Sequence, residues 1–114
     1  MLPKKYRLTQ EKEIRRVLRN RQMEFRHPLL YLVACQNKLT YTRFKVITSK
    51  KLGKAHDRNR IRRVFVGAFL KIMHNIRKNV DMVLLPNRAC LGIKGEQATG
   101  LLMSAASDFA SDNL

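Results

Sequence analysis

Positive charge is the feature that most constrains how this chain can fold. Lysine and arginine account for 24 of the 114 residues, whereas aspartate and glutamate account for only 8, which leaves a formal net charge of +16. Charges of one sign repel one another and oppose a compact state unless something anionic neutralises them. We therefore expect an anionic partner, either a nucleic acid or the surface of an anionic membrane.

The basic residues are concentrated in two segments of the chain. Residues 4–26 hold nine basic and three acidic side chains, and residues 43–78 hold twelve basic side chains and one acid, Asp57. A solvated helix face usually mixes both signs of charge, and the second segment does not. A basic block of this kind is typical of a phosphate-binding surface, so the sequence favours a nucleic acid over the other partners.

A membrane partner is disfavoured by the hydrophobic pattern. The apolar runs at 29–35 and 64–70 are far shorter than a membrane-spanning helix requires. No apolar signal region follows the basic N-terminus, so we expect no secretion. Cys35 and Cys90 lie far apart and form no metal-type pair. We expect them to be reduced core residues of a cytoplasmic protein.

Hydrophobic periodicity predicts helices and strands in a mixed order. We expect helices at 9–20, about 58–75 and about 95–109, and strands at 29–35, 43–48 and 80–85. Thr9 and Asp57 are the expected N-caps of the first two helices. The turn-like residues 36–38 indicate that the first two strands form a hairpin. This order predicts an α+β or α/β fold, with helices packed on a small sheet, in one domain over residues 1–114.

Catalytic and metal-binding patterns are not visible in the sequence. His27, His56 and His74 are scattered without neighbouring ligands at metal-binding spacing, and no nucleophile is paired with a base. A two-metal nuclease site in the protein would require clustered carboxylates, and the eight acids of this chain are not clustered. We expect no catalytic residue and no metal ligand in this chain.

The densest basic stretch is a glycine-containing loop that leads into the long helix. Backbone N–H groups at a helix N-terminus favour an anion, and arginine binds phosphate through two parallel hydrogen bonds. The stretch reads Ser49-Lys50-Lys51, then Gly53-Lys54-Ala55, then Arg58-Asn59-Arg60-Ile61-Arg62-Arg63. This composite motif resembles the bacterial ribonuclease P protein component. The resemblance covers about residues 2–90 and includes Leu2-Pro3-Lys4-Lys5, Arg7-Leu8, Ala68-Phe69, Asp81-Met82-Val83 and Arg88.

The resemblance implies both a fold and a function. The implied fold is an α+β sandwich with a four-stranded sheet, the order α-β-β-β-α-β-α and a left-handed βαβ crossover. The implied function is that of the non-catalytic protein subunit of ribonuclease P. Such a subunit binds the catalytic RNA subunit and the 5′ leader of precursor tRNA, and so assists the Mg²⁺-dependent endonucleolytic 5′ maturation of tRNA. The resemblance assigns the Mg²⁺ to the RNA.

The resemblance also implies two sets of binding residues. The residues expected to contact the RNA subunit are Lys50, Lys54, Arg58, Asn59, Arg60, Arg62 and Arg63. The residues expected to contact the leader are Ile14, Leu18, Tyr31, Lys51 and Arg58. Ile14 and Leu18 stand where the family often has aromatic side chains, so we expect leader binding to depend mainly on charge.

Two other functions remain compatible with the size and charge. One is a ribosome-associated protein, or another protein that binds structured RNA. The other is a DNA-binding regulator that uses the long basic helix. No short turn joins two helices in the predicted order, which argues against a helix-turn-helix. We therefore expect precursor tRNA and a catalytic RNA as partners, with neither DNA nor a membrane.

Overall fold

The computed structural model describes residues 2–75 and 79–111. Within these residues the chain forms three α-helices and four strands. They are α1 (Glu11–Asn20), β1 (Met23–His27), β2 (Leu30–Gln36), β3 (Arg43–Val46), α2 (Ala55–Ile72), β4 (Val80–Pro86) and α3 (Gly95–Ser111). This order confirms the expected α+β fold with the arrangement α-β-β-β-α-β-α.

The four strands form one mixed sheet in the order β1-β2-β4-β3. β4 runs antiparallel to β2 and parallel to β3. The sequence analysis predicted a hairpin between the strands at 29–35 and 43–48, which are β2 and β3. That prediction is wrong, because β4 lies between these two strands. The sequences of β2 and β4 are apolar almost throughout. Such sequences suit central strands, because both faces of a central strand are buried here. β3 alternates basic and apolar residues, which suits an edge.

β1 is the strand that periodicity did not identify. It pairs antiparallel with β2, with Met23 opposite Ala34 and His27 opposite Leu30. Its sequence does alternate, and Met23 is buried while Glu24 is exposed. Only two of its five residues, Met23 and Phe25, are apolar, so the signal is weak.

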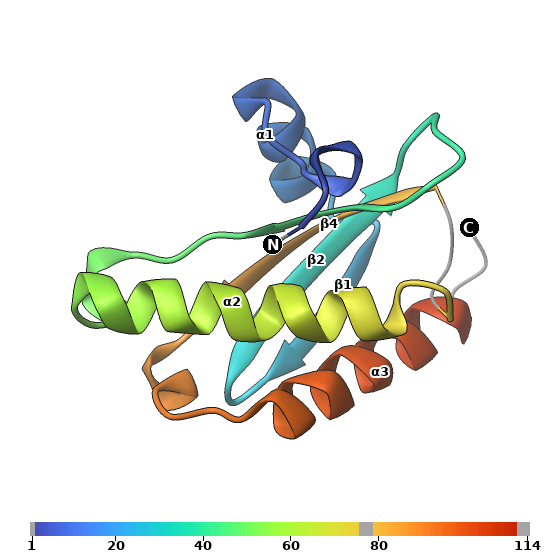
Figure 1. The fold of residues 1–114 in the computed structure, drawn as a ribbon. Helices are drawn as coiled ribbons and strands as arrows, with labels where there is room; N and C mark the ends of the chain where they lie inside the picture. The colour runs from blue at the N-terminus through green and yellow to red at the C-terminus, as the bar shows by residue number, and fades with distance from the viewer. Residues whose placement is uncertain (1, 76–78, 112–114) are drawn as a thin grey trace.

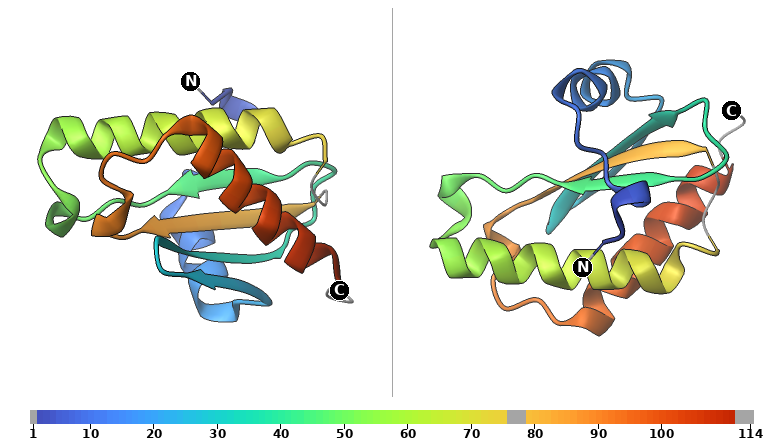
Figure 2. Two further views of the ribbon diagram at one scale, coloured as in Figure 1. Left: turned by 90° about the horizontal axis from the view of Figure 1, so that it is seen from below. Right: turned by 45° about the horizontal axis from the view of Figure 1, so that its top comes forward.

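The helices cover opposite faces of the sheet (Figure 2). α2 and α3 pack on one face over a core that includes Phe44, Phe65 and Phe69. α1 packs on the other face over a smaller cluster around Val17. In Figure 1, β3 and β4 run from right to left behind α2, with β4 below β3. A quarter turn clockwise makes both strands point upward, and β4 then lies to the left of β3. The β3–α2–β4 connection is therefore left-handed, against the usual rule.

α2 begins about one turn earlier than predicted, at Ala55 and not near residue 58. The helix begins at Ala55 with Lys54 as its N-cap, and Asp57 is the third helical residue. The Asp57 carboxylate accepts a hydrogen bond from the Lys54 backbone N–H at 3.3 Å. Asp57 therefore caps the helix from inside its first turn, where a negative charge is favourable. α1, in contrast, begins later than expected, at Glu11, and its N-cap is Gln10 and not Thr9.

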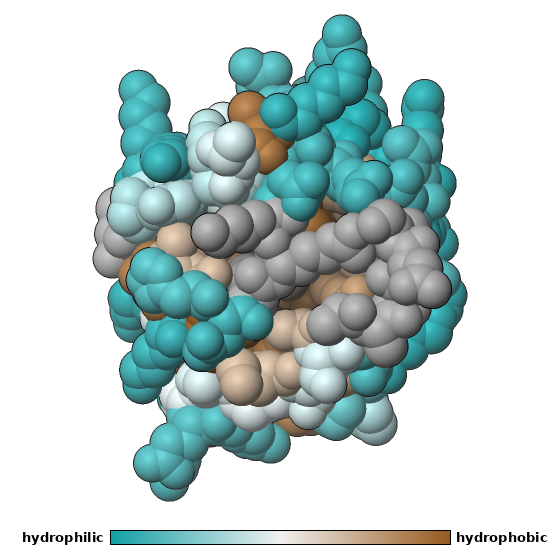
Figure 3. Space-filling model, turned by 90° about the vertical axis from the view of Figure 1, so that its right-hand side faces the viewer, coloured by the Kyte–Doolittle hydropathy of each residue, from teal (hydrophilic) through white to brown (hydrophobic). Residues whose placement is uncertain are grey.

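Hydrophilic side chains predominate on the side of the molecule shown in Figure 3, with small hydrophobic areas between them. Among the described residues, no helix is both long enough and apolar enough to cross a membrane.

Candidate nucleic-acid interface

A network of arginines and carboxylates fixes α1 to the sheet. At its centre the Asp81 carboxylate is fully buried in β4. Arg16 of α1 donates to Asp81 at 2.5 Å, and Arg43 of β3 donates to it at 2.8 and 2.9 Å. Arg43 also donates to Glu13 of α1 at 3.1 Å. The two carboxylates raise the pKa of the Arg43 guanidinium above its ordinary value, chiefly through the hydrogen bonds to Asp81.

The ion pairs that arginines form within the described residues lie on the side of the molecule that carries α1. Within the described residues, the paired arginines are Arg15, Arg16, Arg26 and Arg43. None of the seven basic residues from Lys50 to Arg63 pairs with a carboxylate there. The acids thus neutralise the arginines that hold α1, and they leave the charge around α2 available to a partner.

The motif arginines of α2 differ in what they contact. Arg62 donates to Asn59 Oδ1 at 2.5 Å and to Thr48 Oγ1 at 2.7 Å, both uncharged acceptors. Arg63 is exposed, and its side chain has no hydrogen bond within the described residues. Neither guanidinium pairs with a carboxylate within the described residues, which suits both to phosphate contacts.

Arg60 contributes to the structure as well as to the charge. Its Nη2 donates to the Ile93 carbonyl at 2.6 Å, in the segment that joins β4 to α3. Its Nη1 is buried and has no hydrogen-bond partner among the described residues, and the same is true of Nε in half-buried Arg58. The sequence pattern places Arg60 away from the apolar face of the helix and Arg58 on the flank of that face. It carries no signal for the Arg60–Ile93 bond, which spans 33 residues.

The loop before α2 presents its lysines to solvent. Lys50 and Lys51 are exposed on a short 3₁₀ turn that buried Leu52 anchors, and Lys54 is exposed at the helix start. Gly53 adopts φ +151°, and a Cβ there would lie 3.2 Å from Asp57 Oδ2. Glycine therefore permits the close approach of the loop to the first turn of α2.

The face between α1 and the sheet brings together three of the expected leader residues. Ile14 and Leu18 of α1 and Tyr31 of β2 are half-buried around the same small cluster. The cations against the Tyr31 ring are Arg26, at 4.7 Å from the ring centroid, and Arg21, at 6.0 Å. No contact joins Lys51 or Arg58 to that ring within the described residues, so the expected leader residues form two separate groups.

The Tyr31 hydroxyl donates a hydrogen bond to the Glu24 carboxylate on the adjacent strand. This bond raises the pKa of the Tyr31 phenol and lowers the pKa of the Glu24 carboxyl. The bond and the Arg26 guanidinium restrain the ring, so Tyr31 is held in place before any ligand arrives.

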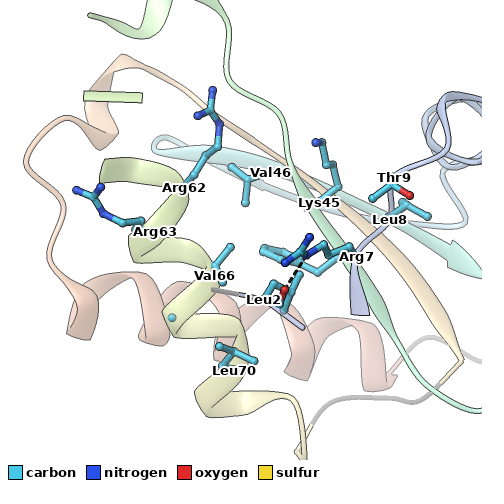
Figure 4. Close-up of a pocket in the computed structure, with 12 residues that line it drawn as sticks. Leu2, Arg7, Leu8, Thr9, Lys45, Val46, Arg62, Arg63, Val66 and Leu70 are labelled. Atoms are coloured by element: carbon cyan, nitrogen blue, oxygen red, sulfur yellow. Dashed lines mark hydrogen bonds between the residues drawn. The ribbon is translucent and has the colours of Figure 1, made fainter. Parts of the chain in front are cut away.

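A pocket that the sequence did not reveal lies at the open edge of the sheet (Figure 4). Its volume is about 560 Å³, and it is enclosed by the N-terminal segment, β3 and α2. The lining residues are Leu2, Arg7, Leu8, Thr9, Phe44, Lys45, Val46, Arg62, Arg63, Val66, Gly67 and Leu70. Arg7 and Lys45 were not predicted as site residues. The alternation in 43–48 was the available signal, because it places basic side chains along one face of the edge strand.

The potential metal ligands and the two thiols form no metal site within the described residues. Among the described residues, no group of three or more His, Cys, Asp or Glu side chains could hold a metal ion. Cys35 and Cys90 are free and buried, as expected. Burial raises the pKa of both thiols.

Comparison with known proteins identifies relatives along most of the chain. A family model described as Ribonuclease P matches residues 2–107. A protein component of ribonuclease P from Clostridium botulinum is 34% identical over 83 residues, which are 72% of this chain and 74% of that protein. Another from Syntrophomonas wolfei is 34% identical over 93 residues, which are 81% and 76% of the two chains.

Solved structures show the same fold at lower sequence identity. A mutant RNase P protein from Staphylococcus aureus superimposes with a TM-score of 0.81 at 23% identity, over 91% of this chain and 87% of that one. The RNase P protein from Thermotoga maritima gives a TM-score of 0.79 at 18% identity, over 88% of this chain and 94% of that one.

Proposed function

Because the chain belongs to the family of ribonuclease P protein components, we propose that it is the non-catalytic protein subunit of a ribonuclease P in the bacterial cytoplasm. It binds the catalytic RNA subunit and the 5′ leader of precursor tRNA, and Mg²⁺ acts at the RNA. The observation that carries this proposal is the separation of charge. Acids neutralise the arginines around α1, whereas no basic side chain of the motif on α2 pairs with a carboxylate in the part of the chain that the structure describes.

The RNA subunit docks on α2 and the loop before it. Lys50, Lys54, Arg58 and Arg63 supply positive charge, and binding phosphates there releases counterions from the RNA. Arg62 is already oriented by Asn59 and Thr48, so little conformational entropy is lost when its guanidinium meets a phosphate. Arg60 adds charge and also fixes the segment before α3 beside this surface.

The leader lies over the face between α1 and the sheet. Ile14 and Leu18 offer apolar contact but no aromatic face, and Tyr31 is the aromatic ring among the proposed leader residues. Arg26 already lies against the Tyr31 ring, which leaves less of it for base stacking. Charge from Lys51 and Arg58 then dominates, so leader binding is strongly salt-dependent and weakly selective for base.

The experiment is reconstitution with the ribonuclease P RNA encoded in the same genome. We expect no cleavage of precursor tRNA by the purified protein alone, and cleavage at near-physiological salt when protein, RNA and Mg²⁺ are combined. Cleavage by nuclease-free protein without RNA would refute the non-catalytic role. Sequencing of RNA recovered with the protein from cells separates the alternative, because dominant ribosomal RNA would indicate a ribosome-associated protein.

Precursor tRNAs with and without a leader test the second surface. We expect the holoenzyme to bind the leader-containing substrate more tightly, and the difference to shrink as salt rises. Equal affinity for both substrates at two salt concentrations would leave only the RNA-docking role.

A further inference from the structure

The pocket at the edge of the sheet combines two chemistries that one ligand class matches. Its floor is apolar and is formed by Leu2, Leu8, Phe44, Val46, Val66 and Leu70. Its rim carries the four cations Arg7, Lys45, Arg62 and Arg63, and none of the lining residues is acidic. An apolar recess surrounded by cations suits a ligand with a flat, weakly polar group and a negatively charged group on each side of it.

The walls of the pocket are held in place by the fold. Leu8 donates from its backbone N–H to the Phe44 carbonyl at 3.2 Å, which ties the N-terminal segment to the edge strand β3. Arg7 Nε donates to the Leu2 carbonyl at 2.7 Å, and the dashed line in Figure 4 shows this bond among the lining residues, between β3 and α2. The volume of about 560 Å³ lies in the range of ligand pockets, roughly 300–1,000 Å³.

The charge of the rim is not used inside the protein. Lys45 and Arg63 make no side-chain hydrogen bond, and none of the four rim cations forms an ion pair, within the described residues. Arg7 and Arg62 bond only to uncharged oxygens. The rim is therefore free to bind anions, and it adjoins the docking surface because Arg62 and Arg63 belong to both.

We propose that this pocket receives one unpaired nucleobase of the RNA subunit, while the cations of the rim bind the phosphates on either side of it. This inference rests on the proposed function and adds to it a subsite that the motif does not include. An unstacked base offers apolar faces to the floor, and proteins that recognise RNA commonly bind such splayed bases. A bare phosphate would leave the apolar floor unused.

Gly67 provides a direct test. It lines the pocket from the middle of α2, and a Cβ at this position would meet no atom within 4 Å. Gly67→Leu therefore fills the pocket without disturbing the core or removing a charge. Gly100→Leu is the matched control, because Gly100 is exposed in α3 and a Cβ there also meets nothing within 4 Å. Both changes replace a helical glycine by a better helix former, so neither should lower Tm.

The affinities of the two variants are measured with the ribonuclease P RNA encoded in the same genome, together with base-specific chemical footprinting. We expect Gly67→Leu to weaken binding about tenfold or more, as loss of one bound base does, with an unchanged salt slope. One or a few unpaired bases should be protected by the wild type and by Gly100→Leu, and should become reactive with Gly67→Leu. Wild-type affinity and footprint in Gly67→Leu would overturn the inference alone. Failure of the wild-type protein to bind this RNA would refute the proposed function itself.

Crosslinking gives a second measurement if Gly67→Leu does not fold. The native thiols Cys35 and Cys90 are buried, so Gly67→Cys can be labelled selectively with a photoreactive group. We expect crosslinks to an unpaired nucleotide of the RNA, and none to that nucleotide from Gly100→Cys. Crosslinks confined to duplex RNA, or the same crosslinks from both positions, would refute the pocket as a base site.

Discussion

Asp81→Asn is the substitution that most directly tests how α1 is held on the sheet. The Asp81 carboxylate has no exposed surface and accepts hydrogen bonds from Arg16, Arg43 and Asn37. Asparagine keeps the size of the side chain but removes its charge. It also places an amide NH₂ where one oxygen now accepts from Arg16 and Arg43, so that donor faces donor.

The expected loss of stability follows from burial and from the remaining partners. Removing one member of a buried ion pair costs about 3–5 kcal/mol. The Arg16 side chain is 36% exposed, so water can compensate it in part, and Arg43 keeps its bonds to Glu13. We therefore expect the lower end, about 3 kcal/mol. At roughly 4 °C per kcal/mol for a domain of this size, Tm should fall by about 12 °C.

Thermal and urea unfolding monitored by circular dichroism measure this loss. Glu11→Gln is the matched control, because it removes the same charge from an exposed i,i+4 pair with Arg15, whose side chains are 77% and 62% exposed. Exposed pairs of this kind contribute at most about 0.5 kcal/mol. If Asp81→Asn unfolds within about 0.5 kcal/mol of Glu11→Gln, the network does not hold α1, and the reasoning is wrong.

Three further predictions concern single side chains. Arg60→Ala should lower the free energy of unfolding by about 1–2 kcal/mol in urea titrations, because a charged donor to the Ile93 carbonyl is lost; an unchanged midpoint would make Arg60 a purely RNA-facing residue. Tyr31 should ionise above its ordinary pKa of 10.0, and Glu24→Gln should move the midpoint of the tyrosinate absorbance back toward that value, since the hydrogen bond to Glu24 is the main cause of the shift. Cys35 should react with a disulfide reagent only when the protein unfolds, because burial raises the pKa of its thiol and blocks access; fast reaction in native buffer would contradict the buried position.

The elements that the sequence predicted well are those with strong apolar periodicity. The stripe of Ile14, Val17 and Leu18 identified α1, and the continuous apolar runs identified β2 and β4. β1 was missed because two apolar residues alternating over five positions look much like a polar loop. The predicted hairpin between 29–35 and 43–48 was wrong because it rested on the closeness of the two strands in sequence and not on how deeply each strand is buried. Strands apolar on both faces belong in the centre of a sheet, and the alternating strand belongs at its edge.

The site was predictable in its charge but not in its long-range contacts. The motif of the resembled family singled out the cations of α2 as a group, and their role in RNA binding stays a prediction. Nothing local distinguishes Asp81, whose partner Arg16 lies 65 residues away, from an acid at a strand end. The pocket is likewise built from three separate segments, so no single stretch of sequence contains it. Such features depend on the order of the strands, and only the structure shows that order.

The position of β4 determines when this sheet can form during synthesis. β4 is the last of the four strands along the chain, yet it lies between β2 and β3. Until the ribosome has made residues 80–86, β3 has no neighbouring strand, and the hairpin of β1 and β2 would stand nearly alone, which is marginal in water. The basic segment that becomes α2 is thus made before the sheet that it covers is complete. While this segment waits for β4, both its cations and the apolar face that later packs on the sheet are exposed, and completion of β4 is the step that lets that apolar face be covered.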